Sequence, residues 1–369
     1  MFFYQNTRGL RSKTVNFFHN LISTNYDVIC IAETWLNSGV LSCELFTSAY
    51  DVFRRDRECT GSLKRKGGGV LVAVKSELQA SLCSDLQSEA EDDWIFLRNS
   101  NGNKMFICCV YIPPGDNNAY VLFINNLHSH EHTFSEKAVT NVGDFNLSNL
   151  EWIKVKNENF FQATQVDERT SPLVDAFSYF GLMQFNNIRN YNNRTLDLVL
   201  CNKSLISCVD RSEFGLVDED RHHPSLEFYI KEITINPLDH GNRNVFDFNK
   251  ADYMSINNDL AGVEWENLFL DRSLEEAVNL FYLKIKAVID NYVPSFKIKG
   301  KYPVYFKLET IRTINKKNKY HKKYKRFNDR VSYLTFTRLR RQSKQMMRGD
   351  FYDFVQTSES RIQTDAKKL

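Results

Sequence analysis

Short apolar runs recur along the first 230 residues at lengths typical of β-strands rather than of helices. They cover residues 1–5, 28–32, 69–74, 94–97, 105–112, 138–142, 196–201 and 226–230. Between some of them, residues 13–23, 120–128 and 172–180 carry apolar side chains at helical spacing. Many strands with few intervening helices predict an α+β fold in which two sheets pack face to face with helices outside.

The chain changes character beyond residue 231. Residues 246–293 lose the strand pattern and show helical spacing, as at Leu274, Val278, Phe281 and Ile285. We therefore divide the chain into a sandwich domain at 1–230, a helical acidic connector at 231–296 and a basic helical tail at 297–369.

A formal net charge of +3 conceals a strong asymmetry. Residues 297–348 contain 18 Lys and Arg against 2 acids, whereas residues 1–296 contain 27 against 39. The basic segment includes Lys316, Lys317, Lys322 and Lys323, interleaved with Tyr320, Tyr324 and Phe327 on one helix face. Such a helix either binds nucleic acid, including RNA, through charge and base stacking, or is simply a solvated amphipathic helix.

The cysteines and the hydropathy bear on the compartment. The eight cysteines show no paired Cys-x-x-Cys spacing, and several lie inside apolar runs, which predicts reduced thiols. No signal peptide precedes the first strand, and no apolar run reaches the roughly 18 residues of a membrane span. We expect an intracellular protein, nuclear or cytoplasmic, without a membrane partner.

Two strand ends offer carboxylates. The run 138–142 leads directly into Gly143-Asp144-Phe145-Asn146, and the run 28–32 ends at Glu33. Carboxylate oxygens are the ligands that Mg²⁺ prefers, so these residues are candidates for metal and phosphate chemistry. The alternatives are an ordinary Asp/Asn turn and a surface glutamate at the start of a loop.

Further along, polar residues stand in apolar surroundings. Tyr111 could donate its hydroxyl to a phosphate oxygen, although a core tyrosine before a proline turn explains it equally. Asp197 lies inside an apolar strand, where a charge is costly unless it has a partner. His222 or His223 could be that partner, and a protonated imidazole beside a phosphate would stabilise developing negative charge.

Other clusters allow two interpretations. Arg54 and Arg57 could touch a DNA backbone or belong to an ordinary charged loop. His128, His130 and His132 could bind a metal ion, but a solvated helix end is the simpler interpretation.

Six motifs stand in a fixed order: Asn6 after Gln5, Glu33 in Ala-Glu-Thr-Trp, Tyr111 in Tyr-Ile-Pro-Pro, Gly-Asp144-Phe-Asn146, Leu-Asp197-Leu-Val, and His-His-Pro. In this order, residues 1–230 resemble the endonuclease/exonuclease/phosphatase superfamily. They are most similar to the apurinic-like endonuclease domain of non-LTR retrotransposons of the jockey or RTE type. The resemblance implies the four-layer α/β/β/α sandwich of deoxyribonuclease I. No Tyr/Phe-x-Asp-Asp polymerase signature occurs in this sequence.

The resemblance also implies a role for each residue in Mg²⁺- or Mn²⁺-dependent hydrolysis of a phosphodiester bond. Glu33 would be the principal metal ligand, with Asn6 beside it. Asp144 would orient or deprotonate the attacking water, and Asn146 would hold that water or a phosphate oxygen. Tyr111 and a histidine would contact the scissile phosphate, while Asp197 would support the histidine.

The sequence departs from the family pattern at three places. The final motif commonly reads Ser-Asp-His-x-Pro, whereas Arg221 occupies the aspartate position here. This favours His222 as the catalytic histidine, with Asp220 and His223 as the alternative pair and Asp220 as a further metal ligand. Arg8 and Pro114 replace residues typical of apurinic endonucleases, which implies loss of a preference for abasic sites. The first strand, with five residues before Asn6, is expected to be short.

The leading hypothesis is therefore a DNA-nicking, metal-dependent endonuclease with no obligate protein partner. Two alternatives stay open: a phosphatase of the same superfamily, and an inactive remnant that binds nucleic acid through its tail.

Overall fold

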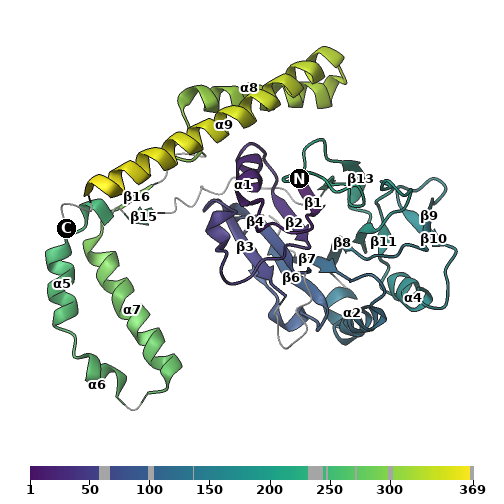
Figure 1. The fold of residues 1–369 in the computed structure, drawn as a ribbon. Coiled ribbons are helices and arrows are strands. Elements are labelled where there is room, and N and C mark those ends of the chain that lie inside the picture. Colours follow the sequence, from purple (N-terminus) through teal and green to yellow (C-terminus); the bar gives the residue numbers. More distant parts are fainter. Residues whose placement is uncertain are drawn as a thin grey trace. The chain divides into compact units, whose positions relative to one another are not determined.

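The computed structural model describes residues 1–57, 67–98, 104–135, 137–231, 244–246, 248–270, 272–297 and 302–365 (Figure 1). The chain forms two compact units. One consists of Met1–Pro237 together with Val304–Leu369, and the other is Leu238–Pro303. In this division the C-terminal helices belong to the same unit as the sandwich. The sequence suggested instead a separate tail beginning at residue 297.

The first sheet has six strands in the order β13-β14-β1-β2-β4-β3. Their bounds are Ile206–Arg211 (β13), Leu226–Ile230 (β14), Phe2–Asn6 (β1), Val28–Ala32 (β2), Val70–Lys75 (β4) and Tyr50–Arg55 (β3). β1 and β2 run parallel and are connected through helix α1 (Thr14–Ile22), while the other neighbours are antiparallel. The parallel pair brings the carboxyl ends of β1 and β2 to the same edge.

The second sheet has eight strands in the order β5-β6-β7-β8-β12-β11-β10-β9. Their bounds are Ser81–Leu82 (β5), Glu91–Arg98 (β6), Lys104–Tyr111 (β7), Ala138–Asp144 (β8), Asp197–Cys201 (β12), Met183–Gln184 (β11), Phe161–Thr164 (β10) and Glu151–Lys154 (β9). β7 and β8 are parallel, so their carboxyl ends also meet at one edge.

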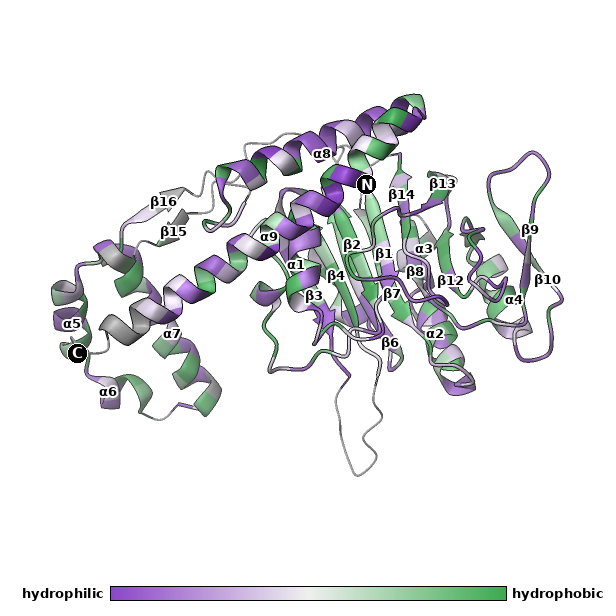
Figure 2. Ribbon diagram, turned by 45° about the horizontal axis from the view of Figure 1, so that its top comes forward, coloured by the Kyte–Doolittle hydropathy of each residue, from purple (hydrophilic) through white to green (hydrophobic). Residues whose placement is uncertain are grey.

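Alternating side chains divide the apolar residues among three cores. In β1, Phe2 and Tyr4 face the second sheet, whereas Phe3 on the opposite face packs beneath α1. The outer face of the second sheet is covered by α2 (Asn117–Ser129) and α4 (Ser171–Tyr179). Figure 2 shows hydrophobic residues concentrated on the strands of the two sheets. The resulting α/β/β/α sandwich confirms the predicted fold class.

All eight predicted apolar runs overlap strands, but several short elements were not anticipated. Within the two sheets, the unanticipated strands are β3, β5, β9, β10, β11 and β13. Their residues are only partly buried or exposed in several cases, so no clear apolar alternation marks them; β3, for example, is half-buried throughout. The short elements η1 (Ser42–Glu44), η2 (Ser76–Leu78), η3 (Ser84–Leu86) and α3 (Glu131–Ser135) complete this part of the chain.

The second unit contains mostly helices. Its elements are β15 (Asn244–Phe246), η4 (Phe248–Lys250), α5 (Tyr253–Ala261), α6 (Trp265–Phe269), α7 (Leu274–Tyr292) and β16 (Ser295–Lys297). Helix α7 begins at a capping box, in which the Ser273 backbone N–H donates to Glu276 Oε2 over 2.9 Å and the Ser273 hydroxyl accepts from the Glu276 backbone N–H. The Trp265 and Phe281 rings pack 5.6 Å apart and join α6 to α7.

The C-terminal helices α8 (Leu308–Phe327) and α9 (Arg330–Asp365) form a hairpin that contacts the sandwich. Lys317 is buried and donates from Nζ to the carbonyl of Ser23 over 2.7 Å. The Arg340 guanidinium lies 3.7 Å from the centre of the Phe214 ring. These contacts make the hairpin part of the same folded unit as the two sheets.

Among the described residues, no helix is both long and apolar enough to cross a membrane. The seven described cysteines are free thiols, and Cys59 lies outside the described residues.

Candidate active site

Polar side chains from both sheets meet where two parallel strand pairs end. Asn6 ends β1, Glu33 follows β2, and Tyr111 and Asp144 end β7 and β8. Asp144 is paired in register with Tyr111 on one side and with Asp197 of β12 on the other. The topology therefore brings Asn6 and Asp197, which are 191 positions apart in sequence, to one edge of the sandwich.

Asn6 joins the two carboxylates that face each other across the sheets. Its Nδ2 donates to Glu33 Oε1 and to Asp144 Oδ2, each over 2.9 Å. Its Oδ1 accepts from the backbone N–H of Arg8 over 3.1 Å. This corrects the expected metal-ligand role of Asn6, because its amide nitrogen rather than its oxygen faces the carboxylates. Asn6 instead holds Glu33 and Asp144 together.

The Glu33 loop has an unusual backbone. Glu33 and Trp35 have left-handed φ angles of 49° and 52°. Such conformations are uncommon for residues with a side chain and persist where surrounding bonds enforce them. Here the backbone N–H of Gly9 donates to the Glu33 carbonyl over 2.8 Å, and Trp35 Nε1 donates to Glu33 Oε2 over 3.2 Å. The loop thus fixes the direction of the Glu33 carboxylate.

His223 completes the cluster. Its Nδ1 lies 3.1 Å from Asp197 Oδ2 and 3.8 Å from Asp144 Oδ2. The hydroxyl of Tyr4 donates to Asp197 Oδ1 over 2.8 Å. Tyr4 was not anticipated from the sequence, although an inward-facing tyrosine in β1 and an acid in an apolar strand together give a signal for such a pair. Asp197 thus holds the imidazole and is itself held by Tyr4.

Burial sets the electrostatics of the cluster. It raises the pKa of Asp144 well above its usual range, and repulsion from Asp197 adds to this effect, while His223 partly opposes it. Burial alone would lower the pKa of His223, but attraction to Asp197 and Asp144 outweighs it and raises that pKa to about 9. His223 is therefore a cation at neutral pH.

The structure distinguishes the two adjacent histidines and corrects the preference for His222. The backbone N–H of His223 donates to the carbonyl of Asp220 over 3.1 Å, closing a turn in which successive side chains diverge. His223 points into the cluster, whereas His222 Nδ1 lies 3.5 Å from Asn192 Nδ2. The Arg221 guanidinium lies 5.4 Å from the centre of the Tyr191 ring, so the substitution in the family motif is directed away from the buried carboxylates.

Asp220 also differs from expectation. Its Oδ2 accepts from Arg8 Nη1 over 3.2 Å and its Oδ1 from the His222 backbone over 2.9 Å. Asp220 is not in the group of described residues whose potential ligand atoms all lie within 4.8 Å of one another, which is presented below.

Tyr111 and Asn146 border the carboxylates. Burial, followed by the charges of Glu33 and Asp144, raises the pKa of Tyr111, so its hydroxyl stays protonated and can donate. Asn146 has a left-handed φ of 51°, and its backbone N–H donates to Asp144 Oδ1 over 3.1 Å. Its Nδ2 donates one hydrogen to the carbonyl of Ile112 over 2.8 Å. An amide nitrogen has two hydrogens, so the second can reach a phosphate oxygen or water.

A divalent cation fits this donor set. Among the described residues, Glu33, Asp144 and His223 form the group whose potential ligand atoms all lie within 4.8 Å of one another. Two carboxylates suit Mg²⁺ or Mn²⁺, and a positive ion would offset the repulsion among buried acids. In this group Glu33 and Asp144 would supply oxygen ligands to such an ion, and His223 lies beside them.

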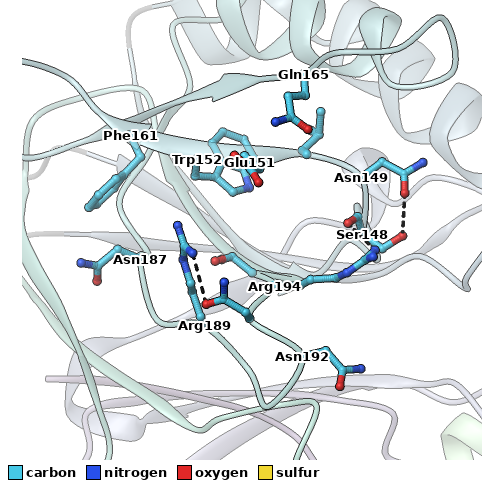
Figure 3. Close-up of a pocket in the computed structure, with 13 residues that line it drawn as sticks. Ser148, Asn149, Glu151, Trp152, Phe161, Gln165, Asn187, Arg189, Asn192 and Arg194 are labelled. Atoms are coloured by element: carbon cyan, nitrogen blue, oxygen red, sulfur yellow. Dashed lines mark hydrogen bonds between the residues drawn. The ribbon is translucent and has the colours of Figure 1, made fainter.

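A polar cavity of about 600 Å³ is lined by residues that lie between Asn146 and Asp197 in the sequence (Figure 3). Its lining includes the rings of Trp152 and Phe161 and the guanidinium groups of Arg189 and Arg194. Arg194 Nη1 donates to the carbonyl of Ser148, two residues after Asn146, over 2.6 Å. This cavity could not be predicted from the sequence, because its lining residues come from three separate segments.

The predicted nucleic-acid contacts lie in different environments. Arg57 pairs with Glu91 and lies 5.8 Å from the Tyr111 ring, at the margin of the cluster. Arg54 is occupied by Asp56 and by the carbonyls of Asn37 and Val40, so a structural role replaces the expected DNA contact.

The lysines of α8 likewise differ in their exposure to solvent. Lys316, Lys322 and Lys323 are exposed, but Lys317 is buried against Ser23. Lys317 is therefore a docking residue and not a nucleic-acid contact.

The predicted histidine cluster is not part of the site. His128 packs against Tyr179 and Phe180, at ring distances of 5.3 and 5.0 Å, and His130 Nδ1 lies 2.9 Å from the carbonyl of Asn126.

Comparison with known proteins places the chain in a family. Residues 4–218 match the model of the endonuclease/exonuclease/phosphatase family. No curated protein matches the chain. Similar solved structures include the endonuclease domain of TRAS1, a telomere-specific non-LTR retrotransposon, at 14% identity with 62% of this chain and 99% of that chain covered (TM-score 0.43). The AP endonuclease LMAP from Leishmania major is 13% identical, with 62% and 87% covered (TM-score 0.47). The 3′-5′ exonuclease NExo from Neisseria meningitidis is 11% identical, with 62% and 98% covered (TM-score 0.43). Since the matched segment spans more than half of the chain and contains Asn6, Glu33 and Asp144, the protein belongs to the endonuclease/exonuclease/phosphatase family.

Proposed function

We propose that the chain is a Mg²⁺-dependent endonuclease that nicks DNA, of the type found in non-LTR retrotransposons. One observation carries the proposal: Asn6 joins the Glu33 and Asp144 carboxylates at 2.9 Å each, beside an imidazole held by Asp197. A divalent cation at Glu33 and Asp144 would offset negative charge on the scissile phosphate. The remaining chemistry is assigned to side chains of this protein.

Asp144 is the proposed acceptor of a proton from the attacking water. In the metal-free protein, burial and repulsion from Asp197 raise the pKa of Asp144. A divalent cation beside it would favour the ionised carboxylate, which is the form that accepts a proton. The backbone N–H of Asn146 and Nδ2 of Asn6 fix the orientation of its two oxygens. A fixed base within hydrogen-bond reach of water satisfies the geometric requirement of general base catalysis.

His223 and Tyr111 are the proposed phosphate contacts. The raised pKa of His223 keeps its imidazole charged at neutral pH, and the raised pKa of Tyr111 keeps its phenol neutral. Both groups are therefore hydrogen-bond donors, as a phosphate that gains charge in the transition state requires. Asp197 and Tyr4 act as positioning residues for the imidazole.

Two features support DNA as the substrate. Arg57 lies at the margin of the cluster, and the adjacent cavity presents Arg189 and Arg194 beside two aromatic rings. Arginine and aromatic side chains suit phosphates and bases. The motif order in the sequence supports the retrotransposon type, and Arg8 and Pro114 support cleavage without a preference for abasic sites.

A nicking assay on supercoiled plasmid with Mg²⁺ tests the proposal. The full chain should convert closed circles to open circles, and Glu33→Ala should abolish the conversion. Glu266→Ala, which removes an exposed acid on α6, serves as the matched control and should nick normally. Equal nicking by the Glu33→Ala variant and the unmodified chain would overturn the assignment.

Release of inorganic phosphate from phosphomonoesters, without plasmid nicking, would instead identify a phosphatase. Metal-independent DNA affinity without either reaction would identify an inactive remnant. The outward direction of Arg221, together with the intact pair of Asp197 and His223, argues against the remnant.

A further inference from the structure

We infer that the outward face of α8 is a binding surface for single-stranded nucleic acid, distinct from the catalytic cluster. Arg312, Lys316, Lys319, Lys323 and Arg326 recur at intervals of four and three residues, which places them on one side of the helix. All five are exposed. The stripe extends over about 21 Å at 1.5 Å per residue.

The opposite side of α8 is used for docking. Thr310 Oγ1 donates to Asp350 Oδ2 over 2.6 Å, and the ring of His321 stacks on Phe336 at 4.6 Å. Lys317 contacts Ser23, and Tyr324 packs on Tyr333 at 4.9 Å. Since these contacts hold the helix from one side, the cationic stripe must face outward.

Little negative charge offsets the stripe. Glu309 is the acid within α8, and Asp329 follows the helix at 4.0 Å from Lys323 Nζ. An exposed pair at that distance contributes little stability, so Lys323 remains able to bind a phosphate. Polar residues predominate along this helix in Figure 2. A row of cations with few acids is complementary to a phosphodiester backbone.

Two aromatic residues on the edge of the stripe favour a single strand over a duplex. Tyr320 follows Lys316 by four residues and Phe327 follows Lys323 by four, so cationic and aromatic side chains alternate along that edge. Phe327 is 60% exposed and Tyr320 is half-buried. Unpaired bases can stack on such rings while the lysines contact phosphates, whereas the bases of a duplex are already stacked on each other.

The surface is separate from the proposed nuclease site. Lys317 docks on Ser23, which precedes β2, whereas Glu33 follows the other end of β2. A five-residue strand spans about 16 Å, so the two regions lie toward opposite ends of the first sheet. The inference therefore does not depend on catalysis and can be tested without a metal ion.

The experiment measures fluorescence anisotropy of labelled 20-nucleotide (dT) and (U) strands and a 20-base-pair duplex, with the full chain in EDTA. Lys316→Ala combined with Lys323→Ala should weaken binding of the single strands about tenfold and make the slope of log affinity against log salt about 1.4 less negative, at 0.7 per phosphate. Phe327→Ala should weaken it about tenfold through lost stacking. The two single strands distinguish RNA from DNA.

Lys284→Ala combined with Lys286→Ala is the matched control, because it removes two exposed lysines from α7. This control should change the affinity for the single strands by less than about twofold and should leave the slope of log affinity against log salt unchanged. Alanine is a strong helix former, so both double variants should retain their helices, which circular dichroism can verify. An unchanged slope in the α8 variant, an equal loss in the control, or duplex binding as tight as single-strand binding and insensitive to Phe327→Ala would overturn the inference.

Discussion

At the scale of single residues, function depends on which of two adjacent histidines turns inward. His223 is 6% exposed and meets Asp197, while His222 lies beside Asn192. The sequence alone could not decide between them, because Arg221 disrupts the motif that would have aligned them. The turn from Asp220 to His223 determines which histidine faces the carboxylates. It is closed by the hydrogen bond from the His223 backbone N–H to the Asp220 carbonyl, which forms only when the chain is folded.

His223→Ala should reduce the nicking rate by about 10² to 10³, the range seen when a preorganised donor to developing charge is removed. His222→Ala should change it less than about threefold, since that side chain has no contact with the carboxylates. Thermal unfolding should first show that both variants are folded as stably as the unmodified chain. Equal losses of nicking rate in both variants would show that His223 is not the histidine on which catalysis depends.

Asp93 allows a pH-dependent prediction at the same scale. It is fully buried, its Oδ1 accepts from Gln87 Nε2 over 3.0 Å, and burial followed by repulsion from Asp92 raises its pKa to about 6. A raised pKa in the folded state means that its contribution to stability is greatest below about pH 4 and is lost as pH rises through 6. At pH 8 the charged group should cost on the order of 3 kcal/mol.

Asp93→Asn removes this charge. Relative to the unmodified chain, the variant should gain on the order of 3 kcal/mol of stability at pH 8 and only about 1 kcal/mol at pH 4.5. Thermal unfolding at the two pH values gives the comparison. A difference in melting temperature that is the same at both pH values would exclude the proposed cause.

At the scale of elements, apolar alternation was sufficient to find the strands that carry the site. The buried strands β1, β2, β7, β8 and β12 all followed from apolar runs, and so did the positions of Glu33, Asp144 and Asp197 at their ends. The hairpin of β9 and β10 did not, since its strands have only four residues each and are exposed or half-buried. Neither did the docking of α8, because an amphipathic pattern indicates that a face is covered but not what covers it.

The docking can be tested at Phe336 of α9, which is 1% exposed and packs on Phe214 with a ring distance of 4.5 Å. Phe336→Ala should cost about 3 kcal/mol through lost burial and a cavity. Hydrogen exchange should then accelerate in α8 and α9 much more than in β1 and β8. Leu334→Ala, at an exposed position on the same helix, is the control and should leave exchange unchanged.

At the scale of the whole molecule, charge is distributed unevenly along the chain. Residues 1–296 carry 27 basic and 39 acidic residues, and residues 297–348 carry 18 and 2. This asymmetry was visible in the sequence, but its structural consequence was not: some of the cations dock α8 and α9 on the sandwich, as Lys317 and Arg340 do, and others remain exposed.

Binding of a divalent cation should stabilise the folded protein as a whole. At a free Mg²⁺ concentration ten times its dissociation constant, linkage gives about 1.4 kcal/mol. For a chain of 369 residues this corresponds to a rise in melting temperature of about 2 °C. The rise should disappear with EDTA and in Glu33→Ala, but persist in Glu266→Ala. An equal rise in the Glu33→Ala variant would place the metal elsewhere.

The proposed function requires the carboxylate of Asp144 to take part in metal-dependent cleavage of DNA. The most direct measurement is the rate at which the full chain nicks a supercoiled plasmid in Mg²⁺, compared with Asp144→Asn. Asparagine has the same shape and can keep the bond from the Asn146 backbone, so the variant removes the charge and the base with little change in packing. We predict nicking by the unmodified chain and a loss of at least about 100-fold in the variant. Nicking at the same rate by both proteins, or a plasmid left closed by the unmodified chain in Mg²⁺ and in Mn²⁺, would contradict the account.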